Sequence, residues 1–380
     1  MGRLIKLNEE RLVNEFLELI QVNSETKDEA NIAQVLIDKF QQLGVEVIED
    51  NAKSITGHGA NNLICNLQGT NKEADKIYFT AHMDTVTPGN NIKPSIEDDY
   101  IISDGTTILG ADDKAGIAVI LEAIRVLKEE KIEHSDLQFV ITVGEESGLV
   151  GAKAIDTSLL TSEYGYALDS DGDVGNIVVE APYQAHIKTT IIGKSAHAGV
   201  APEKGVSAIT VAANAVANMP LGRIDEATTA NIGYFKGGKA SQTNVVCDTV
   251  EIVAEARSLH EEALTKQLTN MQQAFERTAN EYGATAEITI KTMYPGFSHD
   301  ATDKVVQVAQ QAAHTLQLPC ELLKSGGGSD ANIFNGHGIP TVNLSVGYEH
   351  IHTTEEKIHQ NHLYNLTKLV LQIIMNVNKQ

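Results

Sequence analysis

The sequence predicts an α/β fold, in which a mixed, mostly parallel sheet is flanked by helices and interrupted by an inserted ferredoxin-like α+β domain. Two observations lead to this prediction. Helix-like and strand-like segments alternate at both ends of the chain, which favours a parallel sheet covered by helices. The middle of the chain instead follows the order β-α-β-β-α-β. We therefore expect one α/β domain, residues 1–179 and 296–380, and a second domain at residues 180–295.

Apolar spacing predicts each element of the α/β domain. Leu12, Phe16 and Leu19 recur at helical spacing, and Gly44 marks the end of a second helix that begins near Ile32. The later elements are expected, in order, as a strand at 77–81, a helix at 115–130, strands at 137–143 and 164–168, a helix at 302–316, a strand at 341–346 and a helix at 356–376.

The inserted domain is predicted in the same way. Its first strand alternates between apolar and polar residues, as a half-exposed strand does, and its last helix has one apolar side. The expected elements are a strand at 183–193, a helix at 205–218, strands at 228–236 and 248–258, a helix at 261–281 and a strand at 285–293.

Composition excludes several classes of function. The 51 acidic residues outnumber the 29 lysines and arginines, for a net charge of -22, so nucleic acid and anionic membranes are not expected partners. No apolar run is long enough to span a membrane, and the first ten residues contain no signal core. The three cysteines form neither a disulfide framework nor a zinc pattern. We expect a cytoplasmic protein with reduced thiols.

Five short segments rich in histidine and acidic residues lie at the ends of apolar, strand-like runs. They are His82-Met83-Asp84, Ala111-Asp112-Asp113-Lys114, Gly144-Glu145-Glu146-Ser147, Leu168-Asp169-Ser170 and His350-Ile351-His352. Sites in open α/β sheets collect at the carboxyl ends of strands. Together these segments hold enough nitrogen and oxygen ligands for two metal ions, with one carboxylate left to act on water, and so indicate metal-assisted hydrolysis.

Two of these segments allow a division of roles. Because His82 and Asp84 are two residues apart, they face the same side of a strand, and Asp84 is suited to orient the His82 ligand. A lone His-x-Asp is weak evidence of a metal site. Asp112 and Asp113 precede a helix, where one acid is explained by N-capping; Asp112 is the better candidate for a metal bridge.

The other segments are also ambiguous one at a time. Glu145 and Glu146 would repel each other unless a cation compensates, which suits one ligand and one general base, although a solvated turn explains them too. Asp169 ends an apolar strand, and His350 and His352 read equally as loop residues. Five such segments, all at strand ends, favour the metal site jointly.

These residues resemble the M20 family of di-zinc peptidases and amidohydrolases, and within it the peptidase T-like branch. The resemblance covers nearly the whole chain in order, including the inserted domain, and ends at His352. The motifs that carry it are Thr80-Ala81-His82-Met83-Asp84-Thr85-Val86, Leu109-Gly110-Ala111-Asp112-Asp113-Lys114-Ala115-Gly116, Gly144-Glu145-Glu146-Ser147-Gly148 and Gly326-Gly327-Gly328-Ser329-Asp330-Ala331.

The resemblance implies a role for each residue. It implies two Zn²⁺ ions, with Co²⁺ or Mn²⁺ as possible substitutes. The implied ligands are His82 and Asp169 for one ion, Glu146 and His352 for the other, and Asp112 for both. Asp84 would orient His82, and Glu145 would be the general base; the role of His350 stays open.

The resemblance also makes residues 180–295 a lid and dimerisation domain, and residues 1–179 and 296–380 the catalytic di-metal domain. Alone, His197 would be taken for an ordinary turn residue, but the family motif makes it the group that stabilises the oxyanion. Asn244 and Arg257 would bind the substrate. A homodimer through the lid is implied, and His197 would act in its own subunit or in the neighbour.

The expected function is that of a zinc-dependent exopeptidase on short peptides. The preferred form is an aminopeptidase that releases N-terminal residues from tripeptides, through a metal-bridging hydroxide with Glu145 as general base. The alternative is an N-acyl-amino-acid deacylase or carboxypeptidase-type M20 amidohydrolase, and a remote one is a non-catalytic metal-binding protein. A cysteine nucleophile lacks an activating motif, and the glycine run at 325–329 lacks the lysine of a phosphate loop.

Overall fold

The structure is a computed structural model that describes residues 6–378, and its chain divides into two compact units. The first contains the chain through Glu180, together with Ser298–Ser325 and Ser329 onward. The second contains Ala181–Phe297 and Gly326–Gly328. The domain boundaries expected from the sequence, after residues 179 and 295, lie beside these divisions. The return of three glycines to the second unit was not expected.

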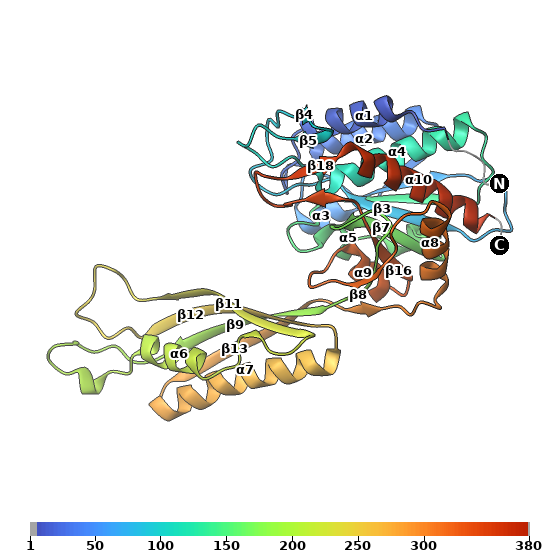
Figure 1. The fold of residues 1–380 in the computed structure, drawn as a ribbon. Helices are drawn as coiled ribbons and strands as arrows, with labels where there is room; N and C mark the ends of the chain where they lie inside the picture. The colour runs from blue at the N-terminus through green and yellow to red at the C-terminus, as the bar shows by residue number, and fades with distance from the viewer. Residues whose placement is uncertain (1–5, 379–380) are drawn as a thin grey trace. The chain divides into compact units, whose positions relative to one another are not determined.

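The first unit is built on a mixed nine-stranded sheet in the order β1-β2-β6-β3-β7-β16-β8-β14, with β15 paired to β8 (Figure 1). Its centre, β6-β3-β7-β16, is parallel, while antiparallel pairs join β2 to β6 and β8 to β16. The predicted mixed, mostly parallel sheet is therefore confirmed. The strands are β1 (Glu46–Glu49), β2 (Leu63–Leu67), β3 (Ile77–His82), β6 (Leu137–Thr142), β7 (Tyr164–Ser170), β8 (Ile177–Ala181), β14 (Phe297–Ser298), β15 (Leu322–Lys324) and β16 (Thr341–Ser345).

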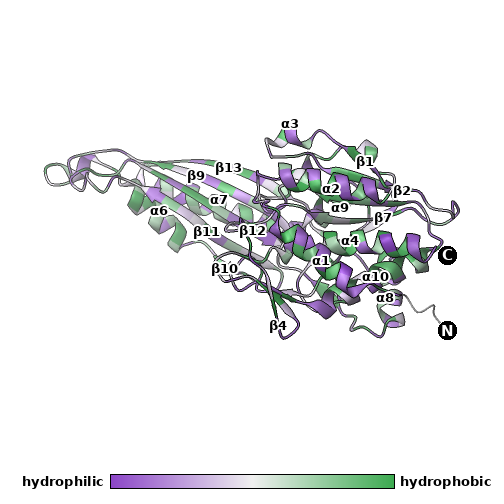
Figure 2. Ribbon diagram, turned by 90° about the horizontal axis from the view of Figure 1, so that it is seen from above, coloured by the Kyte–Doolittle hydropathy of each residue, from purple (hydrophilic) through white to green (hydrophobic). Residues whose placement is uncertain are grey.

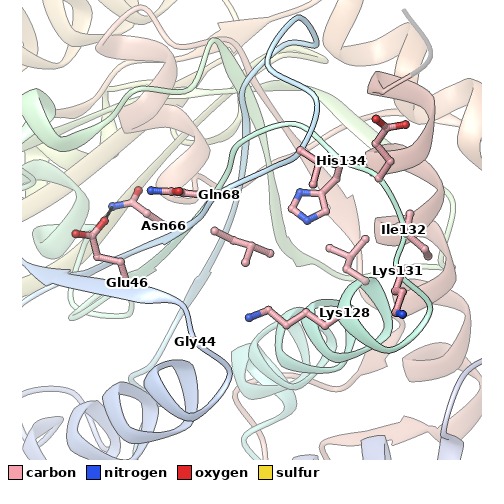
Figure 3. Close-up of a pocket in the computed structure, with 12 residues that line it drawn as sticks. Gly44, Glu46, Asn66, Gln68, Lys128, Lys131, Ile132 and His134 are labelled. Atoms are coloured by element: carbon pink, nitrogen blue, oxygen red, sulfur yellow. Dashed lines mark hydrogen bonds between the residues drawn. The ribbon is translucent and has the colours of Figure 1, made fainter.

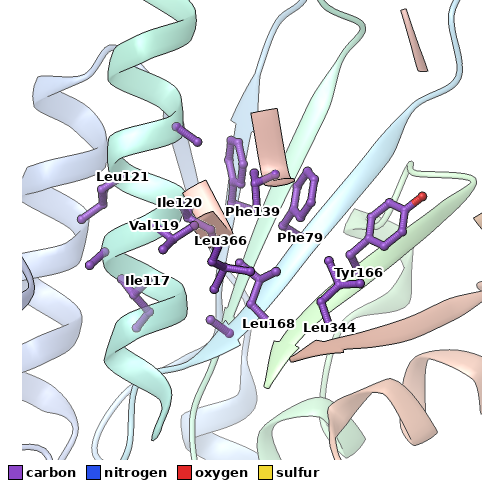
Figure 4. Packing of buried hydrophobic residues seen from close by; sticks show 14 of the residues in the cluster. Phe79, Ile117, Val119, Ile120, Leu121, Phe139, Tyr166, Leu168, Leu344 and Leu366 are labelled. Atoms are coloured by element: carbon purple, nitrogen blue, oxygen red, sulfur yellow. The ribbon is translucent and has the colours of Figure 1, made fainter. Parts of the chain in front are cut away.

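Helices cover both faces of this sheet because the side chains of each strand alternate between the faces. Phe79 of β3 and Phe139 of β6 join the main core against the longer helices (Figure 4), whereas Tyr78 packs with Phe334 of α9 in a separate cluster. The helices are α1 (Glu9–Gln21), α2 (Ala30–Gln42), α3 (Ala52–Thr56), α4 (Ala111–Glu129), α5 (Val150–Lys153), α8 (Lys304–Thr315), α9 (Asp330–Gly336) and α10 (Gln360–Val377), with a 3-10 turn at Thr157–Leu159.

The helix α4 lies inside the core rather than on its surface. It packs against β3 and β7 on one side and against α1 and α10 on others, so nearly all of its residues are buried. Surface helices such as α2 carry alternating hydrophilic and hydrophobic bands (Figure 2), as expected of helices with one face on a core.

A small four-stranded sheet corrects one helix boundary. It has the order β17-β18-β5-β4, from Tyr348–Glu349, Lys357–His359, Tyr100–Ile102 and Ser95–Glu97. The last helix was expected from residue 356 but begins at Gln360, because the backbone of β18 pairs with β5 and is extended there.

The second unit has the predicted ferredoxin-like order. Its antiparallel sheet runs β10-β11-β12-β9-β13, and α6 and α7 bury Val211, Met271 and Phe275 against it. The elements are β9 (Tyr183–Ile192), a 3-10 turn (Pro202–Lys204), α6 (Ala208–Ala217), β10 (Gly222–Arg223), β11 (Thr228–Gly237), β12 (Thr249–Ser258), α7 (Glu261–Tyr282) and β13 (Thr285–Tyr294). Within residues 6–378, no helix has both the length and the apolar character needed to cross a bilayer.

Candidate metal centre

The predicted ligands of the first unit lie at one edge of its sheet. The central strands are parallel, so their carboxyl ends meet at the same edge. His82 is the last residue of β3, Asp169 is near the end of β7, and Glu146 follows β6. His352 lies after β16 and the short strand β17, and Asp112 is in the first turn of α4. The chain segments that the sequence singled out are therefore gathered by topology.

Asp112 lies between two histidines. Its Oδ1 is 3.0 Å from Nε2 of His82, and its Oδ2 is 3.2 Å from Nε2 of His352. Nε2 of His352 is also 2.9 Å from Oε1 of Glu146. A carboxylate whose two oxygens face two separate groups of ligands has the arrangement that a bridge between two metal ions requires.

Asp169 is the most distant member of the set. Its Oδ1 is 3.9 Å from Nε2 of His82 and accepts a hydrogen bond of 3.1 Å from the Tyr348 hydroxyl. The Asn343 side chain accepts from the backbone N–H of Asp169 and donates to its carbonyl oxygen, at 2.9 and 2.5 Å. Asp169 is thus held from its neighbouring strand, beside His82.

Asp113 is next to Asp112 in the sequence, but its carboxylate makes different contacts. It is close enough to His82 and Asp169 to form a possible metal group with them. However, its Oδ2 accepts from the His82 backbone N–H at 3.3 Å and its Oδ1 from the Gly116 N–H at 3.2 Å. Asp113 therefore acts as a helix cap, the role that the sequence left open for one of the two acids.

The donor set fits divalent cations. His82, Asp112 and Glu146 bring ligand atoms within 4.8 Å of one another, and these are the nitrogen and oxygen donors that zinc, cobalt and manganese accept. Oε1 of Glu146 is buried, and it faces a second candidate ligand atom, Nε2 of His352, at 2.9 Å. A metal ion would satisfy this oxygen.

The electrostatics also favour a bound cation. Burial and the nearby Asp112 charge raise the pKa of Asp169 well above its usual range. Although burial disfavours the charged forms, His352 and His82 lower the pKa of Asp112, and the Asp112 and Asp84 carboxylates raise that of His82. A buried group of acids compensated only by histidine protons is one that divalent cations stabilise, because they supply positive charge where water cannot.

Asp84 faces His82 most closely with its backbone carbonyl oxygen. Nδ1 of His82 is 2.9 Å from the Asp84 backbone carbonyl oxygen, and 3.5 Å from Asp84 Oδ1. The carboxylate instead accepts hydrogen bonds from the backbone N–H groups of Glu145 and Glu146 and from the Thr26 hydroxyl. Residue 84 thus orients His82 through its backbone and holds the Glu145-Glu146 turn through its side chain.

Glu145 and His350 stay outside the set of close ligand contacts. Burial, and then the Asp169 charge, raise the pKa of Glu145 well above its usual range. Asp84 accepts a hydrogen bond from the Glu145 N–H and so holds its turn, beside the predicted ligand Glu146. The His350 side chain is exposed, and its backbone carbonyl accepts from the Thr353 hydroxyl at 2.7 Å. In the described contacts, His350 stabilises the turn before Glu356 through its backbone carbonyl oxygen.

The three predicted residues of the second unit do not gather at one place. The His197 and Asn244 segments pair through their backbones, and the Ala198 N–H donates to the Asn244 carbonyl oxygen. Both side chains are exposed beyond the Thr249 end of β12. Arg257 lies near the other end, about 26 Å along the strand at the usual rise per residue, where Glu255 pairs with its guanidinium at 3.2 Å.

Sequence reasoning did not assign several residues that support the site. Tyr348 and Asn343 hold Asp169, Thr26 holds Asp84, and the Thr142 hydroxyl donates to Asp330 at 2.5 Å. Asp330 belongs to a motif of the resemblance, and that was a usable signal. The others are single polar residues within apolar or loop segments, where no spacing distinguishes them.

A cavity in the first unit lies away from this centre. It has a volume of about 720 Å³ and lies between the end of α4 and the start of β6, lined by Glu46, Lys128 and His134 among others (Figure 3). The cavity lies beside the start of β6, whereas His82 pairs with Thr142 at the carboxyl ends of β3 and β6. The cavity is therefore not the metal centre. Acidic and basic side chains both line it, and the Lys128 ammonium donates to the Leu43 carbonyl oxygen.

Proteins similar to this chain match it over nearly its whole length. YqjE of Bacillus subtilis is 60% identical over 373 residues, covering 98% of this chain and 100% of that protein. The crystal structure of aminopeptidase PepT from Bacillus cereus is 62% identical, with a TM-score of 0.92 over 98% of this chain and 99% of that one. A tripeptidase from Staphylococcus aureus is 52% identical, with a TM-score of 0.95 over 98% and 100%.

A model of one family matches most of the chain. Residues 78–376 match Peptidase family M20/M25/M40, a span that begins in β3 and ends in α10. It therefore includes every predicted metal ligand. The chain belongs to Peptidase family M20/M25/M40.

Proposed function

We propose that the protein is a zinc-dependent aminopeptidase that releases N-terminal residues from tripeptides and other short peptides. The observation that carries the proposal is Asp112, whose two oxygens face His82 and His352 at 3.0 and 3.2 Å. The aminopeptidase from Bacillus cereus and the tripeptidase from Staphylococcus aureus support the substrate class, since each resembles the chain over nearly its whole length.

The metal-binding roles follow the contacts at the site. His82 and Asp169 would hold one ion, Glu146 and His352 the other, and Asp112 both. Zn²⁺ is the proposed metal, and Co²⁺ or Mn²⁺ suits the same nitrogen and oxygen donors. When bound, the two cations would supply Lewis-acid activation of a water molecule and of the scissile carbonyl.

The protein's own groups would carry the proton and position the substrate. Glu145 would take a proton from the attacking water and pass it to the nitrogen of the leaving amine. For this role a carboxyl group with a raised pKa is suited, because it can both accept and release a proton near neutral pH. Asp84 keeps Glu145 in place through the backbone N–H of the same turn. His197 would stabilise the oxyanion, and Asn244 and Arg257 would bind the substrate.

The separation within the second unit supports a homodimer. An extended tripeptide spans roughly 10 Å, whereas His197 and Asn244 lie at the opposite end of β12 from Arg257. One tripeptide is therefore too short for all three, so we propose that His197 and Asn244 serve the neighbouring subunit. Exposed apolar side chains on this unit, among them Val200 and Phe235, suit contact with a second copy.

We also propose a cytoplasmic location, and neither nucleic acid nor a membrane as a partner. The three cysteines are free thiols, which suits a cytoplasmic location. The net charge of -22 argues against nucleic acid or an anionic membrane as a partner.

The test combines one variant with a substrate panel. Glu145→Ala should lower kcat for a tripeptide by at least about 100-fold, the usual contribution of a general base, with the metal content unchanged. Glu73→Ala, an exposed acid far along the chain, is the control and should match the wild type. Full activity of Glu145→Ala would remove Glu145 from the mechanism.

The panel separates the proposed substrate from its alternatives. Tripeptides, dipeptides and N-acyl amino acids are offered to protein loaded with zinc, cobalt or manganese. Release of the N-terminal residue from tripeptides is expected. Cleavage of acylated amino acids alone would indicate a deacylase, and release of the C-terminal residue a carboxypeptidase. Protein that binds no metal and cleaves nothing would be a non-catalytic relative.

A further inference from the structure

Glu356 is buried and makes three hydrogen bonds to one backbone segment. Its side chain is 1% exposed. Its Oε2 accepts from the N–H groups of Leu109 and Gly110 at 2.8 and 2.7 Å, and its Oε1 accepts from the N–H of Asp112 at 3.0 Å. The two partners are 244 residues apart in sequence. One carboxylate therefore satisfies three donors in the segment that leads into Asp112.

The same short segment contacts Asp112 from two sides. His352 is 3.2 Å from Oδ2 of Asp112, and Glu356, four residues later, binds the Asp112 backbone. A turn joins them, in which the Glu356 N–H donates to the Thr353 carbonyl oxygen at 3.2 Å. One short segment therefore contacts the side chain of Asp112 through His352 and its backbone through Glu356.

We propose that Glu356 is a positioning residue of the metal centre, which holds Asp112 where its two oxygens face both metal positions. This inference rests on the proposed function. The hydrogen bonds described for the Glu356 carboxylate all go to backbone N–H groups, so it would act on the metal centre through the backbone of Asp112. Groups that orient metal ligands in this way usually change metal affinity about 10- to 100-fold when they are removed.

A simpler role has to be separated from this one. Leu109 and Gly110 immediately precede α4 and Asp112 lies in its first turn, so Glu356 also stabilises the entry to that helix, and such a contact stabilises the fold without affecting a metal. Loss of a cap alone would lower the stability of the metal-free protein and leave its metal affinity unchanged. Metal affinity is therefore the decisive measurement.

The variants are Glu356→Gln and Glu356→Ala, with Glu355→Ala as the matched control. Glu355 is the preceding residue and is exposed. Glutamine keeps one acceptor oxygen but turns an NH₂ group toward the remaining N–H, so its effect should be intermediate. Zinc bound per chain is measured after dialysis, and zinc affinity by competition with a chromophoric chelator. Thermal unfolding in EDTA reports the capping role separately.

The expected result is a loss of about tenfold or more in affinity for the weaker-bound zinc in Glu356→Ala, with a smaller loss in Glu356→Gln and none in Glu355→Ala. Saturating zinc should restore part of kcat for a tripeptide and leave KM unchanged. If Glu356→Ala unfolds, Glu356→Gln carries the test.

Two zinc ions bound with wild-type affinity by both Glu356 variants would overturn the inference and leave the proposed function intact. A wild-type protein that binds fewer than two zinc ions would instead contradict the proposed function. The two failures are therefore distinguishable.

Discussion

Replacing Asp84 by asparagine tests how the Glu145-Glu146 turn is held. Asp84 is fully buried, and its Oδ1 accepts from the Glu145 N–H at 3.0 Å. Its Oδ2 accepts from the Glu146 N–H at 3.3 Å and from the Thr26 hydroxyl at 2.7 Å. Asparagine keeps one oxygen, so in either orientation its NH₂ group faces at least one buried N–H.

The expected cost follows from those contacts. A hydrogen bond to a charged group contributes roughly 1.5–3 kcal/mol, and a buried donor left without a partner costs roughly 1–3 kcal/mol. We expect Asp84→Asn to lower the free energy of unfolding by about 2–4 kcal/mol. Thr26→Val removes a single donor and leaves no buried N–H unsatisfied, so it should cost only about 0.5–1.5 kcal/mol.

The assay is urea unfolding of the metal-free proteins, followed by circular dichroism, with Asp28→Asn as the control because Asp28 is exposed. Working without metal separates the turn from any effect on ligand binding. If Asp84→Asn unfolds at the same urea concentration as the control, the carboxylate does not hold the turn. If Asp84→Asn has normal stability but binds zinc more weakly, the main role of the carboxylate is instead to orient the His82 side chain.

Three further predictions concern the rest of the first unit. Phe79→Ala should lower the free energy of unfolding by about 3–5 kcal/mol, as buried aromatic truncations do, because Phe79 stacks between Phe139 and Tyr166. Equilibrium denaturation measures this free energy. A loss of stability no larger than that of a surface substitution would contradict the packing. Burial lowers the pKa of His134, so below pH about 6.5 the unfolded chain takes up more protons than the folded one and stability falls with acid. His134→Gln should reduce that fall in melting temperature between pH 7 and 5, and an unchanged slope would refute it. Burial also raises the pKa of Cys65, so Ellman's reagent should modify Cys65 only after unfolding, whereas rapid labelling of the native thiol would contradict its burial.

The fold was largely predictable because its signals are local. Apolar spacing around Phe16 and along residues 261–281 gives helices close to those found, since each helix needs one apolar face. The errors occur where distant pairing overrides local pattern. Lys357–His359 would continue a helix by its spacing, yet it is extended because β5 offers backbone partners.

The sequence predicted which residues form the candidate site better than it predicted the contacts between them. Residues at the ends of parallel strands meet whatever the loops do, so His82, Glu146 and Asp169 could be grouped from sequence. The choice of Asp112 over Asp113 as the candidate bridging ligand depends on which carboxylate accepts hydrogen bonds from backbone N–H groups with both oxygens. Asp113 does so, and only the folded backbone reveals that.

The residue types and their order along the chain establish the family, the two-part architecture and the chemistry of the donors, because strand ends and ligand types are properties of short segments. Tertiary structure alone decides the supporting contacts. Glu356 looks like an ordinary acid, and Asp84 like a partner of His82 alone, until packing brings both to N–H groups far along the chain. Hydrogen bonds require positions within about 3 Å, and no local pattern specifies distances that small between segments 244 residues apart.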